Sequence, residues 1–251
     1  MSKPKLGINI DHVATVRNAR GENYPSPLRA ALLVQKYGGD SVTIHLREDR
    51  RHIKDKDLIQ IKANLKIPLN LEIAPTKKML KITLKHKPAY VCIVPEKRKE
   101  ITTEGGLNLK RNLNFLRKSI KELKSKNIRT SLFIEPNIAD IKIAKQLDVD
   151  CVELHTGKFC NLHNKKKNTK SEFLKIKKSV NFAKRNNLEP HAGHGITFSS
   201  AKILSRIKDI KEFNIGHFLI GESIFIGIRD CIKKFKSILK KWIFTVSVQT
   251  L

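Results

Sequence analysis

The feature that most constrains this chain is a regular alternation of short apolar segments with longer helical ones. Eight segments rich in β-branched residues are separated by amphipathic stretches. They begin at about Leu6, Ser41, Pro68, Ala89, Arg129, Asp150, Leu188 and Phe213. Alternating β and α units favour a parallel sheet, and eight units in 251 residues match a (β/α)8 (TIM) barrel with extra helices. A doubly wound sheet is the competing fold, but it would usually have fewer strands.

Turn and capping residues divide the helical stretches, and no linker or repeat interrupts them. We expect a single catalytic barrel domain over residues 1–243 and a C-terminal tail of uncertain order at 244–251. Ser26-Pro27 opens a helix that Gly38-Gly39 closes, and a final helix runs from about Ser223 to Trp242. Further helix N-caps are predicted at Asp55, Thr76, Asn137 and Ser171.

The chain is strongly basic, with 51 Lys and Arg against 23 Asp and Glu and a formal net charge of +28. Such a charge raises the possibility of nucleic-acid binding. The basic residues, however, follow amphipathic helices: residues 110–129 hold eight basic residues and one acid around apolar positions at helical spacing. We interpret them as solvated helix faces. Specific nucleic-acid binding is kept as an alternative of a different functional class.

Nothing in the sequence predicts export or a membrane location. The N-terminus lacks the apolar core of a secretory signal, and the most apolar window, residues 218–228, is too short to span a bilayer. The four cysteines show no C-x-x-C pair and no regular spacing. We therefore expect a cytoplasmic protein.

Polar residues recur inside the apolar segments at the positions that face a barrel interior. In the first segment, Leu6, Ile8 and Ile10 share one face and leave Asn9 and Asp11 on the other. The same alternation turns a further set of polar residues inward or places them just beyond strand ends: His45, Arg47, Asn70, Glu72, Glu153, His155, His191, His194, Asn214 and His217. Because burying so many ionisable groups without purpose would cost several kcal/mol each, the pattern predicts an active site at the carboxyl ends of the strands.

Two groups of residues at the strand ends predict anion sites. The first group holds guanidinium groups after strands one and two, namely Arg17, Arg20, Arg47, Arg50 and Arg51. The second holds glycines around strands seven and eight, namely Gly193, Gly195, Gly216 and Gly221. Two anion sites imply two phosphorylated groups.

The motifs that carry these residues resemble, in order, those of the pyridoxine 5′-phosphate synthase family. The longest are Asn9-Ile-Asp11-His12-Val-Ala-Thr-Val-Arg17-Asn-Ala-Arg20-Gly21 and His45-Leu-Arg47-Glu-Asp-Arg-Arg51-His52. The others are Asn70-Leu-Glu72, Val94-Pro-Glu96, Thr102-Thr-Glu-Gly-Gly106, Glu153-Leu-His155-Thr-Gly157, Ala192-Gly-His194-Gly195 and Asn214-Ile-Gly216-His217. The resemblance implies a barrel enzyme of vitamin B6 biosynthesis, assembled as a homo-octamer. It condenses 3-amino-2-oxopropyl phosphate (1-amino-acetone 3-phosphate) with 1-deoxy-D-xylulose 5-phosphate to give pyridoxine 5′-phosphate, phosphate and water.

The resemblance also implies roles for individual residues. His45 and Glu72 are proton acceptors, His194 is the proton donor, and Glu153 stabilises the transition state. The amino-ketone phosphate site comprises Asn9, Arg20, Gly195, Gly216 and His217. The deoxyxylulose phosphate site comprises Asp11, His12, Arg47, His52 and Thr102. The loop 96–106 closes over the barrel mouth, and neither a cofactor nor a metal is expected.

Two positions depart from the family pattern. His191 stands where Asn is common, and Glu222 follows Gly221 where Arg is common.

The competing enzyme class is a metal-dependent barrel hydrolase, which would use His45, His155, His191, His194 or Asp11. Its typical His-x-His at the end of the first strand is absent, because that strand ends in Asp11-His12.

Overall fold

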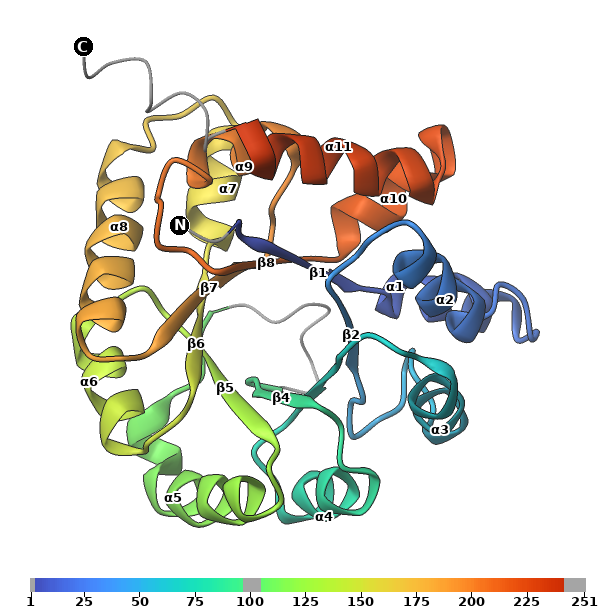
Figure 1. Cartoon of the computed structure of the whole chain (residues 1–251), viewed down its shortest axis with the longest axis horizontal. Helices are drawn as coiled ribbons and strands as arrows, with labels where there is room; N and C mark the ends of the chain where they lie inside the picture. Colours follow the sequence, from blue (N-terminus) through green and yellow to red (C-terminus); the bar gives the residue numbers. More distant parts are fainter. Residues whose placement is uncertain (1–2, 97–104, 242–251) are drawn as a thin grey trace.

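The computed structural model describes residues 3–96 and 105–241. Eight parallel strands close into a barrel in the order β1-β2-β3-β4-β5-β6-β7-β8, and in the described residues eleven helices surround it (Figure 1). The strands are β1 (Lys5–Asn9), β2 (Ser41–His45), β3 (Leu69–Ile73), β4 (Tyr90–Ile93), β5 (Arg129–Ile134), β6 (Cys151–His155), β7 (Glu189–Gly193) and β8 (Glu212–Ile215). The predicted (β/α)8 barrel with extra helices is confirmed.

The helices alternate with the strands, and several strands are followed by two. They are α1 (Asp11–Arg20), α2 (Pro27–Lys36), α3 (Asp55–Asn64), α4 (Lys77–His86), α5 (Leu109–Ser125), α6 (Ile138–Gln146), α7 (Gly157–Asn164), α8 (Lys170–Arg185), α9 (Phe198–Leu204), α10 (His217–Ile226) and α11 (Ile228–Lys241). In the described residues, no helix is long and apolar enough to cross a membrane. The extent of the barrel domain to residue 243 and the 244–251 tail stay predictions, since residues 242–251 lie outside the described part.

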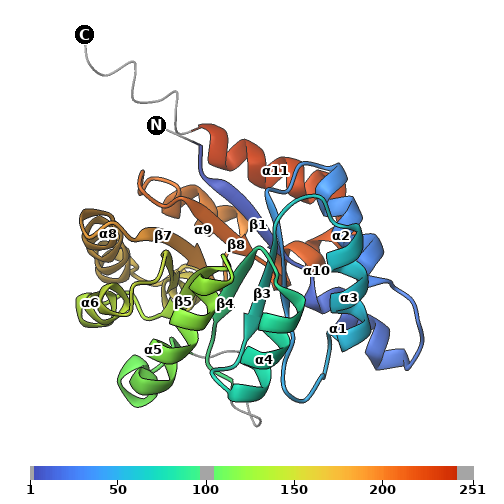
Figure 2. The same ribbon diagram turned by 60° about the horizontal axis from the view of Figure 1, so that its bottom comes forward.

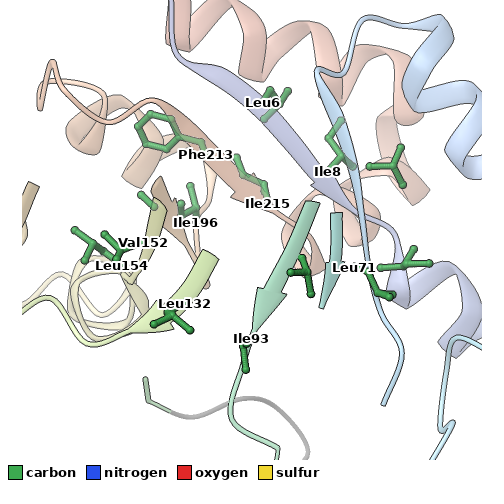
Figure 3. Packing of buried hydrophobic residues seen from close by; sticks show 14 of the residues in the cluster. Leu6, Ile8, Leu71, Ile93, Leu132, Val152, Leu154, Ile196, Phe213 and Ile215 are labelled. Carbon is green, nitrogen blue, oxygen red and sulfur yellow. The ribbon is translucent and has the colours of Figure 1, made fainter. Parts of the chain in front are cut away.

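The core lies between the strands and the helices. Leu6, Leu132 and Leu154 are fully buried on the outer side of their strands, and Figure 3 shows them directed away from the barrel axis. Successive strand residues point to opposite faces, so their neighbours in the sequence point inward. Most of these neighbours are polar or small, but Phe133 forms a separate small apolar cluster with Cys92 and Val94. One hydrophobic layer therefore stabilises the fold and leaves the barrel interior to other groups.

Several helix starts follow their predicted caps. The side chains of Ser26, Thr76 and Asn137 each accept a backbone N–H from the first turn of α2, α4 and α6. Two predicted caps are wrong. Asp55 is the first residue of α3, which Lys54 precedes as N-cap, and α8 begins at Lys170 after Thr169 instead of at Ser171.

The single final helix predicted from about Ser223 to Trp242 is also wrong. Two helices occupy this region: α10 begins at His217, and α11 begins at Ile228. They meet at Gly227, whose φ of +78° is a conformation that residues with a side chain rarely adopt. The break lets α11 lie beside α2 and α9, as Figure 2 shows, with Phe235 4.5 Å from Phe198 between ring centroids.

Candidate active site

The inner face of the barrel is lined by polar side chains that bond to one another across strands. Ser41 donates a hydrogen bond of 3.0 Å to Glu212, which lies 171 residues further along the chain. Gly7 belongs to the same layer, where a side chain would overlap Asn214. The interior positions predicted from period-two alternation are therefore confirmed for β1, β2 and β8.

A first group of acid and amide side chains joins the ends of β1, β2 and β3. Asn9 Nδ2 donates to Asp11 Oδ2 at 2.9 Å and lies 3.5 Å from Glu72 Oε2. Asp11 Oδ1 accepts the backbone N–H of His45 at 2.8 Å, and His45 Nδ1 lies 3.9 Å from Glu72 Oε2. The structure thus brings together Asn9, Asp11, His45 and Glu72, as the sequence predicted.

Burial changes the acidity of both carboxyl groups in this group. It raises the pKa of Asp11 to about 6, although the charges of His45 and Arg47 oppose the rise. The pKa of Glu72 is raised well above its usual range by burial and by the nearby carboxylates of Glu153 and Asp11. The raised pKa favours the protonated form of the Glu72 carboxyl, which can give a proton before it accepts one.

Glu96 extends this group toward the loop after β2. Its Oε2 lies 3.4 Å from His45 Nε2, and its Oε1 accepts the backbone N–H of Glu48 at 2.9 Å and lies 3.8 Å from Arg47. Burial would raise the pKa of Glu96, but His45, the Glu48 N–H and Arg47 lower it overall. His52, whose pKa falls to about 3 because of burial and the charges of His45 and Arg47, completes this side of the site.

A second group lies on β6, β7 and β8. Glu153 is buried and accepts a 2.6 Å hydrogen bond from Asn214. Burial raises the pKa of Glu153 to about 7, and His191 and Asn214 limit that rise. Gly193, paired beside the end of β6, leaves room for this carboxyl, since a side chain at Gly193 would overlap Glu153 Oε1.

His191, the departure noted from the sequence, lies inside the barrel between two carboxyl groups. Its Nε2 is 3.0 Å from Glu189 Oε1, and its backbone pairs with that of Glu153. Glu189 also forms a 2.9 Å ion pair with Arg129. The hydrogen bond from His191 and the charge of Arg129 lower the pKa of Glu189 to about 2 against the effect of burial. The histidine therefore belongs to an ion-paired chain that reaches toward Glu153.

His194 follows β7 at the mouth of the barrel. Burial, together with the neighbouring His155 and His217, lowers its pKa to about 4. The rings of His12 and His217 are 4.9 Å apart, which places residues assigned to the two different substrates side by side. His194 is thus neutral at neutral pH and can act as a donor only after it has taken up a proton.

The glycines around strands seven and eight shape the adjoining loops. Gly195 has a φ of +77°. Gly216 immediately precedes α10 and lies against β1, where a Cβ on Gly216 would be 3.0 Å from the Cβ of Asn9. Backbone N–H groups at the start of α10 are therefore available beside His217 for an anion. Gly221 lies inside α10, where its absent side chain has nothing within 4 Å.

The five arginines predicted to form one anion site have different partners in the structure. Arg17 is buried in a two-pronged ion pair with Asp57 at 2.6 and 2.9 Å, so its role is structural. Arg50 and Arg51 pair with acidic neighbours, while Arg20 is exposed at the end of α1, 3.8 Å from Glu22. Arg47 lies 3.8 Å from Glu96, the carboxylate that also contacts His45. Thr102 and most of the loop 96–106 lie outside the described residues.

One group of side chains has the composition of a cation site. Asp11, His45 and His52 each place a ligand atom within 4.8 Å of the others. Asp11 Oδ1 already accepts the His45 N–H, and His52 Nδ1 accepts the Ile53 N–H at 2.9 Å. A metal would compete with these bonds, which instead fix the loop that carries Arg47.

Two carboxyl groups were missed as site residues. Glu96 and Glu135 each contact a histidine of the site, His45 and His155 respectively. Glu135 directly follows β5, so the rule that functional groups gather after barrel strands would have found it. Glu96 follows β4 at a greater distance, and the sequence carried no signal beyond its motif.

The closed barrel with ionisable side chains gathered at its carboxyl end has the arrangement of a (β/α)8-barrel enzyme. Residues 6–241 match the family described as "Pyridoxal phosphate biosynthesis protein PdxJ". The chain is 56% identical over 237 residues to pyridoxine 5′-phosphate synthase of Pelagibacter ubique, covering 94% of this chain and 99% of that protein. It is 50% identical to the Ehrlichia chaffeensis enzyme of the same name, covering 94% of this chain and 97% of that one.

The chain therefore belongs to the PdxJ family, and its activity is that of a pyridoxine 5′-phosphate synthase in vitamin B6 biosynthesis. More distant structures share the fold alone. The tryptophan synthase A-subunit of Pyrococcus furiosus superposes with a TM-score of 0.61 at 13% identity, covering 94% of this chain and 97% of that one. Phosphoribosylanthranilate isomerase of Thermotoga maritima gives 0.59 at 12% identity, covering 94% and 98%.

Proposed function

We propose that this chain condenses 3-amino-2-oxopropyl phosphate with 1-deoxy-D-xylulose 5-phosphate, releasing pyridoxine 5′-phosphate, phosphate and water. The observation that carries the proposal is the set of buried groups with shifted acidity at the barrel mouth: Asp11, Glu72, Glu153 and His194. Joining an amine to a ketone, eliminating phosphate and closing a ring require several proton transfers in one pocket. The substrate amine supplies the ring nitrogen, so no cofactor is required.

The catalytic roles proposed for His45, Glu72, His194 and Glu153 follow from these charge states. The raised pKa of Glu72 favours its carboxylic-acid form, which becomes a proton acceptor after its proton has left. His194 enters neutral, takes a proton and returns it in a later step as the donor. Glu153, with a pKa of about 7, can oppose positive charge that develops on the reacting amine.

The two phosphorylated substrates are assigned to opposite sides of the mouth. The amino-ketone phosphate is proposed to bind at Asn9, Arg20, Gly195, Gly216 and His217, where the start of α10 supports an anion. The deoxyxylulose phosphate is proposed to bind at Asp11, His12, Arg47, His52 and Thr102, and Arg47 lies 3.8 Å from Glu96. The 4.9 Å contact of His12 with His217 supports a binding mode in which the two substrates lie side by side.

We also propose that the protein is cytoplasmic and assembles as a homo-octamer. Its four cysteines are free and buried, which suits a reducing compartment. On α10, Ile224 and Phe225 are 75% and 81% exposed, and an exposed apolar pair of this size supports a subunit contact. Light scattering of the protein and of Phe225→Ser tests the assembly, which the substitution is expected to weaken.

The test of the activity is an assay with both substrates and no added metal or nucleotide. We expect pyridoxine 5′-phosphate and one equivalent of phosphate to form, as measured by ³¹P NMR. His194→Ala should lose about 10²- to 10⁴-fold in kcat, the usual contribution of one proton-transfer group. Glu122→Gln on the exposed face of α5 is the matched control. Full activity of His194→Ala would refute its assigned role.

A further inference from the structure

Glu135 and His155 form a carboxylate–imidazole pair beside His194 that the proposed roles leave unused. Glu135 follows β5 and His155 ends β6, and these neighbouring strands pair up to Ile134 and Leu154. Glu135 Oε1 lies 2.9 Å from His155 Nδ1 and also accepts the backbone N–H of Gly106 at 2.9 Å. These two bonds fix the orientation of the imidazole.

The other ring nitrogen of His155 points at the site. His155 Nε2 is buried and has no hydrogen-bond partner among the described residues, although the side chain is only 10% exposed. Gly157 leaves the space that both imidazole rings occupy. A Cβ on Gly157 would lie 2.6 Å from His155 Nε2 and 2.7 Å from His194 Cδ2. The absent side chain lets the two rings approach to 4.9 Å between centroids.

The charge of this pair is set by its geometry. The hydrogen bond from His155 lowers the pKa of Glu135, so that Glu135 is a carboxylate at neutral pH. A carboxylate at Nδ1 stabilises an imidazolium. Whenever His155 carries a proton, its charge opposes protonation of His194, because the two ring centroids are 4.9 Å apart. Among the described residues, the groups placed beside the His194 ring are His155 from β6, Phe133 from β5 and His217 from α10.

We propose that His155, held by Glu135, is a positioning residue that acts through His194 and sets the pH at which His194 takes up its proton. The inference rests on the proposed function in one respect, the use of His194 in proton transfer. The charge on His155 itself can be tested in the protein without substrate.

The experiment is an NMR titration of histidine-labelled protein with no substrate present. The His194 midpoint, about 4 in the unchanged protein, should rise by about 1 pH unit in His155→Gln, because the substitution removes a neighbouring charge whose ring centroid lies 4.9 Å from that of His194. His155→Lys, which restores a positive charge, should bring the midpoint back down. His163→Gln on α7, where His163 bonds Ser199, is the matched control and should change nothing.

An unchanged or lowered His194 midpoint in His155→Gln would overturn the proposal. Melting temperatures establish that each variant is folded, and His155→Asn is the second uncharged variant if the Gln variant does not fold. In the two-substrate assay, the acid limb of the kcat/KM profile should move up with the midpoint, and a uniform loss at all pH values would indicate a structural role only and overturn the proposal. If His194→Ala stays active, the proposed catalytic role fails while the titration result stands, so the two failures are distinguishable.

Discussion

The two faces of the barrel strands are built from the same short segments yet have opposite properties. On β3, Leu71 faces the helices and is fully buried among hydrocarbon, whereas Glu72, the next residue, faces the interior beside Asn9 and His45. Burial of Leu71 stabilises the fold by about 1.5 to 3 kcal/mol. Burial of Glu72 instead raises its pKa and costs stability once the group is charged. Burial of hydrocarbon on the outer face therefore stabilises the fold enough to tolerate the destabilising burial of ionisable groups on the inner face.

The carboxyl groups on the inner face differ from the surrounding ion pairs in lying close to one another. Outside the barrel, Arg17 and Asp57 form a bidentate ion pair, in which two guanidinium nitrogens donate to the two carboxylate oxygens. Inside, Glu72 lies near two other carboxyl groups, those of Asp11 and Glu153, which raise its pKa further. Closely spaced carboxyl groups that cannot all ionise titrate at different pH values, which provides acids and bases together at neutral pH.

The largest expected effect comes from removing the acid on the inner face. Glu72→Gln should lower kcat by about 10²- to 10⁴-fold, because the amide has nearly the same shape but cannot transfer the proton. Steady-state kinetics of the two-substrate reaction measure the loss, and thermal unfolding should show no loss of stability. A variant that retains full activity would show that Glu72 contributes only to packing.

The adjacent substitution on the outer face should do the reverse. Leu71→Ala removes buried hydrocarbon and is expected to lower the free energy of unfolding by about 2 to 5 kcal/mol. Urea unfolding measures this change, and Ile59→Ala is the control, since Ile59 on α3 is 53% exposed. At a temperature where the variant is folded, its pH–rate profile should match that of the unchanged protein. A displaced profile would mean that the two faces are not independent.

A smaller and pH-dependent effect is expected at Glu153. Its pKa is about 7 in the folded protein against an ordinary 4.5, so the folded state holds the proton more tightly and the unfolding free energy falls as pH rises from 4.5 to 7. Glu153→Gln keeps an acceptor for Asn214 and removes this cost. Above pH 7 it should be more stable than the unchanged protein, by on the order of 3 kcal/mol.

Below pH 4.5 the two proteins should unfold alike, as measured by melting temperature across the pH range. Glu122→Gln on the exposed face of α5 should show no such dependence. A stability difference that does not vary with pH would contradict the raised pKa of Glu153.

Much of the fold could be predicted because its signals are local. The predicted start of β6 at Asp150 and the observed start at Cys151 differ by one residue, since period-two alternation depends only on neighbouring positions. The break at Gly227 was missed because an isoleucine lies on either side, and the local pattern stays apolar through it. Ser171 was a plausible cap by type, but the chain turns into α8 two residues earlier, at Thr169.

The candidate site divides in the same way. His45, Glu72, Glu153 and His194 were found because each is a polar residue at the end of an apolar strand. Arg17 was misplaced because its partner, Asp57, lies 40 residues away on α3, and no short-range pattern shows that pairing. Glu135 was missed although it follows β5, since its importance becomes visible only when His155 lies against it.

The sequence by itself determined the barrel, the inward direction of the polar residues and, through its motifs, the family. These depend on backbone periodicity and residue type, which are properties of consecutive residues. Only the tertiary structure decided which arginine is structural, which glycines leave room for Glu153 and His155, and which carboxyl groups hold a proton at neutral pH. Desolvation and Coulomb interactions set those outcomes, and both depend on distances between residues that the chain brings together only on folding.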